Sequence, residues 1–155
     1  MPNWLYIVTH TFYLLGVAIW IGGGVILGAL VAPALFGALP RHQAGGIFGP
    51  ILRRFARLRL GAIVVMIITA AIKHLVWETH VVSPWIAIRW LALAVMAAIV
   101  LYELFGLEPA MEKTRPAPEA GEDDPRRASF MRLHRRSEAL MKAGLGAALV
   151  ALLLS

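Results

Sequence analysis

Cysteine is absent from this 155-residue chain, and charged side chains are scarce, at 15% of the residues. The lack of cysteine excludes disulfides, iron–sulfur clusters, zinc–thiolate sites and cysteine nucleophiles. Familiar catalytic motifs are also missing, since the sequence has no phosphate-binding glycine loop, no nucleophile elbow and no HExxH pair. These absences favour a protein that is not an enzyme but leave the question open.

Apolar residues dominate what is present. They make up 59% of the chain, and the mean hydropathy is +0.73, whereas soluble domains are about 45–50% apolar. The net charge is +6, and the basic residues gather in two segments between apolar runs. This arrangement favours membrane lipids with anionic headgroups as partners, and we expect no binding of nucleic acid.

Four apolar segments have about the length that a bilayer requires of a helix. We place these spans at about residues 4–31, 60–77, 85–107 and 137–154. Gly22 to Gly24 and Pro33 are expected to end or bend the first run, which is otherwise too long. The sequence thus predicts an all-α fold, an integral membrane four-helix bundle that forms one membrane domain over residues 1–155.

The connecting segments predict the orientation in the membrane. Lysine and arginine gather in the predicted loops 40–59 and 108–136, and the turn 78–84 has neither residue. The positive-inside rule places both basic loops in the cytoplasm and both termini on the non-cytoplasmic side. We expect the cytoplasmic (inner) membrane of a prokaryote as the location.

Histidines in apolar surroundings suggest a cofactor site, because an ionisable side chain inside a span is costly. His10 and His74 are expected at similar depths from the outer side, where they are candidates to hold a b-type haem or copper. His42 and His134 are a second candidate pair, on the inner side. The alternative for each is a histidine hydrogen-bonded to a neighbouring helix.

Charged residues near the inner ends of the last two spans form a second candidate group. Glu103 and Lys142 are expected to face one another in a salt bridge, with proton or cation handling as the alternative. His134, Glu138 and Lys142 are spaced by four and share a helix face. His134 and Glu138 are therefore candidate metal ligands, or else a structural pair. Lys73 and Arg89, near the outer ends, are expected to reach toward water.

Small residues recur four apart at Gly24 and Gly28 and again at Ala143, Ala147 and Ala151. This spacing lets helices approach closely. It suggests either a homo-oligomer or a subunit of a larger membrane complex, with packing inside one chain as the alternative.

Several sequence blocks resemble the transmembrane protein 205-like family, small membrane proteins grouped under a domain of unknown function. The blocks are His10, Trp20-Ile21-Gly22, residues 33–45, Leu107-Glu108-Pro109 and residues 130–137. The resemblance implies a four-span bundle but no reaction, and it directs attention to Glu108, His134 and Ser137. At Met141 the chain departs from the family, which often has asparagine there.

A weaker similarity connects the histidine and Trp-x-Gly of the first span with haem-binding protoporphyrinogen oxidase-like and copper-resistance membrane proteins. We therefore expect a small membrane protein with a binding, transport-associated or accessory role. The alternative is a haem- or copper-binding membrane protein that uses one of the two histidine pairs.

Overall fold

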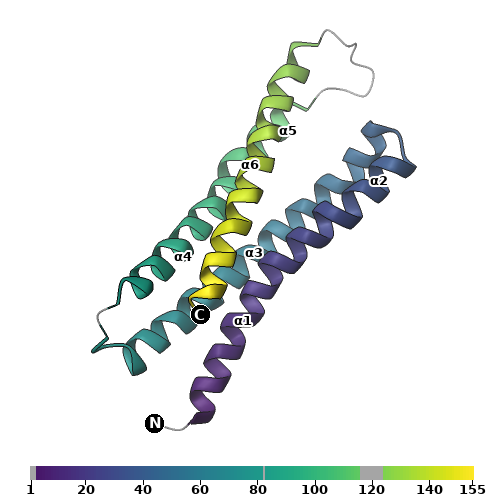
Figure 1. Ribbon diagram of the computed structural model, residues 1–155. Helices are drawn as coiled ribbons and strands as arrows, with labels where there is room; N and C mark the ends of the chain where they lie inside the picture. Colours follow the sequence, from purple (N-terminus) through teal and green to yellow (C-terminus); the bar gives the residue numbers. More distant parts are fainter. Residues whose placement is uncertain (1–2, 82, 116–123) are drawn as a thin grey trace.

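The computed structural model describes residues 3–81, 83–115 and 124–155, and all regular elements in these ranges are helices. The helices lie side by side in an elongated bundle (Figure 1). Three helical stretches are long and apolar enough to cross a membrane, namely Asn3–Ala38, Arg41–Trp77 and Pro84–Lys113. The predicted all-α fold with membrane-spanning helices is confirmed.

The first stretch is one continuous rod of three elements. It comprises α1 (Asn3–Val25), the π-helix η1 (Ile26–Val31) and α2 (Ala32–Ala38). Pro33 does not end the rod, contrary to the expected break. Proline has no N–H to donate to the helical ladder, and the turn that precedes it is widened so that the N–H of Ala32 donates to the carbonyl of Leu27.

The second rod is α3 (Arg41–Trp77), a helix of 37 residues. At 1.5 Å per residue it is about 55 Å long, well beyond a hydrocarbon core of about 30 Å. Residues 41–59, predicted as a connecting loop, are its first half. Arginine is a good helix former, so the charges that mark this segment as extramembrane do not prevent it from being helical.

The third rod repeats the pattern of the first. It comprises α4 (Pro84–Tyr102), the π-helix η2 (Glu103–Leu107) and α5 (Glu108–Lys113), with Pro109 in the first turn of α5. The last helix, α6 (Pro125–Leu153), starts where the Asp124 side chain accepts a hydrogen bond of 2.9 Å from the N–H of Arg126. Most of the predicted loop 108–136 is therefore helical, and residues 116–123 lie outside the described part.

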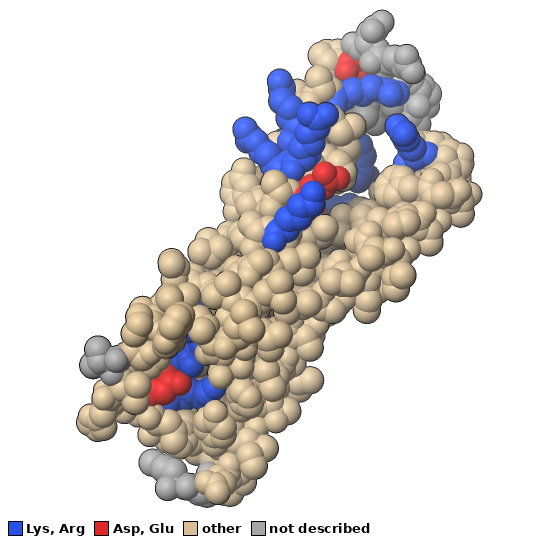
Figure 2. Space-filling model, viewed as in Figure 1, with Lys and Arg blue, Asp and Glu red and all other residues tan. Residues whose placement is uncertain are grey.

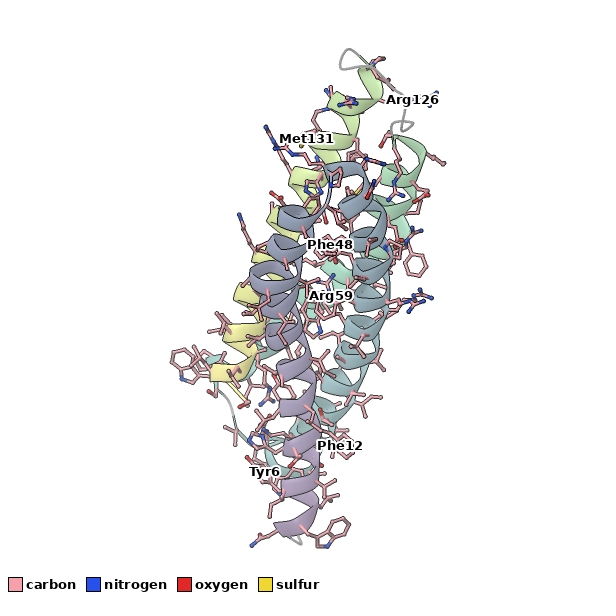
Figure 3. All side chains as sticks on the ribbon, turned by 90° about the vertical axis from the view of Figure 1, so that its right-hand side faces the viewer. Tyr6, Phe12, Phe48, Arg59, Arg126 and Met131 are labelled. Carbon is pink, nitrogen blue, oxygen red and sulfur yellow. The ribbon has the colours of Figure 1, made fainter. Side chains whose placement is uncertain are left out.

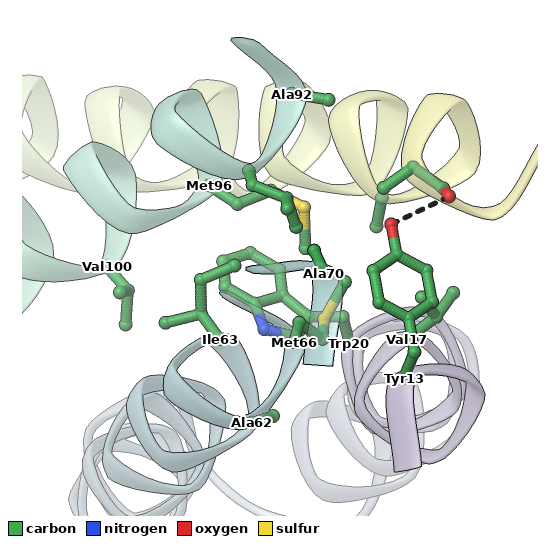
Figure 4. Packing of buried hydrophobic residues seen from close by; sticks show 13 residues of the cluster. Tyr13, Val17, Trp20, Ala62, Ile63, Met66, Ala70, Ala92, Met96 and Val100 are labelled. Carbon is green, nitrogen blue, oxygen red and sulfur yellow. Dashed lines mark hydrogen bonds between the residues drawn. The ribbon is translucent and has the colours of Figure 1, made fainter. Parts of the chain in front are cut away.

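Large apolar side chains from the first three rods, together with alanines of α6, fill the centre of the bundle (Figure 4). Trp20, Met66 and Met96 are at most 1% exposed. The two polar aromatic groups in this core find backbone partners. Tyr13 donates to the carbonyl of Ala151 at 2.9 Å, and the indole N–H of Trp20 donates to that of Arg59 at 3.2 Å. These bonds tie α1 to α6 and to α3.

Glycines of α1 allow the close approach of its neighbours. A Cβ at Gly23 would collide with the ring of Phe55 on α3, and one at Gly24 would lie 2.9 Å from Leu145 on α6. A Cβ at Gly28 would lie 3.9 Å from Met141, also on α6. The Gly24 and Gly28 pair thus packs within the chain. The homo-oligomer and larger-complex hypotheses stay predictions.

Candidate functional site

The buried faces of α3 and the third rod each carry a charge near both ends of the apolar core. On α3 these are Arg59 and Lys73, and on the third rod they are Arg89 of α4 and Glu103 at the start of η2. In each rod the two charges are fourteen residues apart, which is about 21 Å along the axis. Figure 2 shows an uncharged belt between a large charged zone and a smaller one. The bundle thus has two polar layers separated by apolar packing.

Arg59 and Glu103 form a buried ion pair at the end that carries the basic segments. They are 6% and 8% exposed, and the guanidinium Nη2 contacts the carboxylate Oε2. The guanidinium carbon also lies 5.0 Å from the ring centre of Trp20 and 5.1 Å from that of Phe55. Two aromatic faces and one carboxylate therefore hold the Arg59 side chain in place.

This pair corrects the expected salt bridge between Glu103 and Lys142. Since α3 and α4 run antiparallel, Arg59 and Glu103 lie at the same level, and the carboxylate is already occupied. Lys142 has no ion-pair partner within 4.0 Å among the described residues. Proton or cation handling by Glu103 stays a prediction.

A cavity of about 600 Å³ opens directly beyond the ion pair. Here α2 packs against α3, with Phe36 and Phe48 edge to face at 6.0 Å, and α5 packs against α6. The two helix pairs diverge toward their tips (Figure 1), and the surface is hollowed between them (Figure 2). In the side view Phe48 lies farther toward this end than Arg59 (Figure 3). The apolar lining includes Leu27, Phe36, Phe48, Met111, Phe130 and Met141.

Polar side chains surround the apolar lining. Arg53 bridges two carboxylates of α5, with Nε 3.0 Å from Glu108 and Nη1 3.6 Å from Glu112. On α6, His134 Nε2 lies 3.2 Å from Glu138. All of these residues line the cavity. The site therefore combines an apolar interior with fixed charges at its floor and around its mouth.

Both π-helical segments contribute to the cavity wall. Leu27 and Gly28 come from η1, and Glu103 and Leu107 come from η2. A π-helical turn is rare, and it is frequently found at functional sites. Two such segments in the wall of one cavity therefore mark it as a candidate site.

Most of the inner-side candidates predicted from the sequence meet in this cavity. The residues that line it include Glu103, Glu108, His134, Ser137, Glu138 and Lys142. His42 lies at the start of α3 and is not part of the lining that the structure describes, so the structure does not bring it together with His134 there.

Three arginines of the cavity, at positions 53, 59 and 115, were missed as site residues because they were counted only as loop charges. The signal for Arg59 was present. When the apolar stripe of the second span is extended backward in steps of three and four from Met66 and Ile63, it passes through Arg59.

The second polar layer lies at the opposite end of the core. Lys73 and Arg89, expected to reach toward water, are 4% and 3% exposed and point inward. Arg89 donates to both oxygens of Glu78, one of them at 2.9 Å. Lys73 Nζ lies 3.5 Å from His10 Nδ1 and over the Tyr13 ring. Partners inside the bundle thus replace the solvent that was expected for both cations.

His10 and His74 have different neighbours. His10 lies against Lys73 and stacks on Tyr6 at 5.7 Å, whereas His74 meets Trp90 edge to face at 6.4 Å. Within the described ranges, no group of three or more His, Cys, Asp or Glu side chains is close enough to hold a metal ion. The haem or copper hypothesis stays a prediction, which a visible absorption spectrum of the purified protein tests.

Comparison with known proteins gives a family match. The family DUF4149, described as a domain of unknown function, matches residues 15–119. That range contains both residues of the buried ion pair and both π-helical segments. No curated protein and no solved structure matches the chain.

Proposed function

Because the chain belongs to the DUF4149 family, a domain of unknown function, we propose a function from the site itself: the protein binds an amphipathic molecule in the cavity at the basic end of its bundle. The observation that carries the proposal is the cavity of about 600 Å³, with apolar walls and a buried ion pair as its floor. A binding role without catalysis is also what the missing catalytic motifs favour.

The size and lining suit a small molecule. Ligand pockets usually measure about 300–1,000 Å³, and they are mostly apolar with a few fixed polar groups. Phe36, Phe48 and Phe130 supply aromatic wall area. Arg59 and Glu103 are held by each other and by aromatic faces, so the floor presents polar groups whose positions do not need to change when a ligand arrives.

Access from the bilayer is part of the proposal. Ala32 and Phe36 of α2 and Phe130 and Met141 of α6 line the cavity, and these two helices diverge toward their tips (Figure 1). A ligand dissolved in the membrane is therefore able to enter sideways between these two helices. Such a ligand needs an apolar part to reach the site and a polar part to use its charges.

The basic segments flank the cavity, and on the positive-inside rule we place it on the cytoplasmic side of a prokaryotic inner membrane, with both termini on the other side. We further propose that the chain is a transmembrane protein 205-like protein with α6 as a fourth span. The resembling blocks at residues 33–45 and 130–137 support this, because they lie on the two helix pairs around the cavity. A transport-associated or accessory role follows from binding without chemistry.

Filling the cavity tests the proposal. Protein purified in mild detergent is extracted with organic solvent, and bound amphiphiles are quantified by mass spectrometry for the wild type, Ala32→Phe and Ala38→Phe. Ala32 lines the cavity, and Ala38 is an exposed residue of α2 outside its lining. We expect an amphiphile in the wild type and in Ala38→Phe, and its loss in Ala32→Phe. Equal amounts in all three proteins would overturn the proposal.

A further inference from the structure

Among the residues that the structure describes, not every charge that lines the cavity has a partner of opposite sign. Arg59 is paired with Glu103, and Arg53 is paired with two carboxylates of α5. The remaining carboxylate in the lining, Glu138, lies beside His134. Every carboxylate of the lining is therefore already engaged by a basic side chain.

Two cations remain. Arg115 and Lys142 both line the cavity, and neither has a carboxylate within 4.0 Å in the part of the chain that the structure describes. They come from different rods, because Arg115 follows α5 and Lys142 lies on α6. The formal charges of the described lining balance, with four Lys or Arg side chains and four Glu side chains, but these two cations lie apart from the carboxylates and are presented from two directions.

Arg115 reaches across the mouth of the cavity to α3. Its Nη2 atom lies 3.1 Å from the position that a Cβ on Gly49 would occupy. The absence of a side chain at Gly49 leaves room for the guanidinium there. A ligand that enters between the helix pairs therefore meets this guanidinium at the entrance and the aromatic wall behind it.

From this arrangement we infer that the amphipathic ligand is a lipid with a phosphate headgroup, held between Arg115 and Lys142, with its apolar chain against Phe36, Phe48 and Phe130. The inference rests on the proposed function and narrows it. Arginine binds phosphate oxygens in a planar fork, and lysine adds a second positive charge. A cationic amphiphile does not fit, since no lining carboxylate is without a basic neighbour.

The location of the cavity supports the same ligand. The helix pairs that enclose it carry the arginine-rich ends of α3 and α6, and such segments collect anionic lipids at a membrane surface. The opening between α2 and α6 allows the chain of a bound lipid to extend into the bilayer while its phosphate stays inside the site.

The test compares lipids that differ only in the headgroup. The full-length protein is held in a non-ionic detergent that contains no phosphate, and binding of short-chain phosphatidic acid, the matching diacylglycerol and inorganic phosphate is followed by the fluorescence of the tryptophans. We expect phosphatidic acid to bind about tenfold tighter than diacylglycerol, because a charge-assisted hydrogen bond contributes at least that factor.

The variants are Arg115→Gln and Lys142→Gln, with Arg135→Gln as the matched control. Arg135 is an exposed residue of α6 outside the cavity lining. Each of the first two changes should weaken phosphatidic acid binding about tenfold and leave diacylglycerol binding unchanged. Arg135→Gln should alter neither, and circular dichroism checks that all variants are folded.

The outcomes separate the two proposals. Equal affinity for both lipids overturns the phosphate headgroup and leaves the amphipathic ligand standing. Binding of neither lipid overturns both proposals. Inorganic phosphate that binds as tightly as the lipid shows a soluble anion as the ligand, and an equal loss in Arg135→Gln shows only general surface attraction. Either of these two results overturns the lipid assignment.

Discussion

At the scale of single residues, the buried ion pair is the feature with the largest energetic consequence. Arg59 and Glu103 are both almost fully enclosed, and the guanidinium Nε has no hydrogen-bond partner in the described part of the chain. A buried pair gives little net stability compared with apolar residues, but loss of one member leaves an uncompensated charge. Separating the two side chains, or removing one of them, therefore costs free energy even though the pair itself adds little stability.

The first prediction follows from this asymmetry. Glu103→Leu should destabilise the protein by about 3–5 kcal/mol, whereas the double variant Arg59→Met with Glu103→Leu should lie near the wild type. Thermal unfolding in detergent measures both, with the exposed Arg57→Met as control. A single variant as stable as the wild type would show that Arg59 finds another partner.

Glu78 supports a prediction about pH. The hydrogen bond from Arg89 lowers the pKa of Glu78 from its ordinary value of 4.5, against the opposing effect of burial. Because the pKa is lower in the folded state, this carboxylate contributes stability above pH 4.5, and the contribution is lost as the pH falls through the lowered value. The ion pair is thus fully effective at neutral pH.

Glu78→Gln should remove that dependence. The melting temperature of the wild type should fall between about pH 5 and pH 3 by more than that of Glu78→Gln, while the variant is the less stable protein at pH 7. Melting curves over this range provide the measurement. Parallel curves for the two proteins would mean that Glu78 does not titrate in this way.

At the scale of elements, the two π-helical segments have a common origin in the sequence. Each is followed by a helix with proline in its first turn, Pro33 in α2 and Pro109 in α5. Pro50 in α3 lies inside a regular α-helix, so proline alone does not produce the wide turn.

Helix packing at glycine supports a prediction with an internal control. Gly23→Ala should cost about 1–3 kcal/mol, because the new methyl group collides with Phe55, which also packs on Arg59. A Cβ at Gly22 would have no other atom within 4 Å, so Gly22→Ala should stabilise the protein by up to about 1 kcal/mol through helix propensity. Thermal unfolding of the two variants measures both changes in stability. Equal changes would contradict the close packing of Gly23 against Phe55.

At the scale of the whole molecule, the buried charges of the bundle are arranged in two polar layers. The layers lie about 21 Å apart along α3, within a hydrocarbon core of about 30 Å. Each charged side chain in them is turned inward against a partner or an aromatic ring. The outer surface between the layers is left to apolar residues such as Leu15, Val64 and Leu91, which are all exposed.

The absence of cysteine makes the predicted orientation easy to test. Thr79 and Gln43 are both exposed; Gln43 lies in the first turn of α3, and Thr79 follows the other end of that helix. In intact cells, a membrane-impermeant maleimide should label Thr79→Cys at once and Gln43→Cys only after the membrane is opened. The reverse pattern would place the basic segments, and the cavity with them, on the outside.

The sequence by itself determined the fold class, because long apolar segments leave few alternatives to membrane helices. It also identified Glu103, Glu108, His134, Ser137 and Lys142, which the structure brings to one cavity. Only the tertiary structure decided which charges pair, since Arg59 reaches Glu103, 44 residues away in the chain, through the antiparallel packing of two rods. Local patterns describe one helix face at a time. The partner of a buried charge depends on which faces meet.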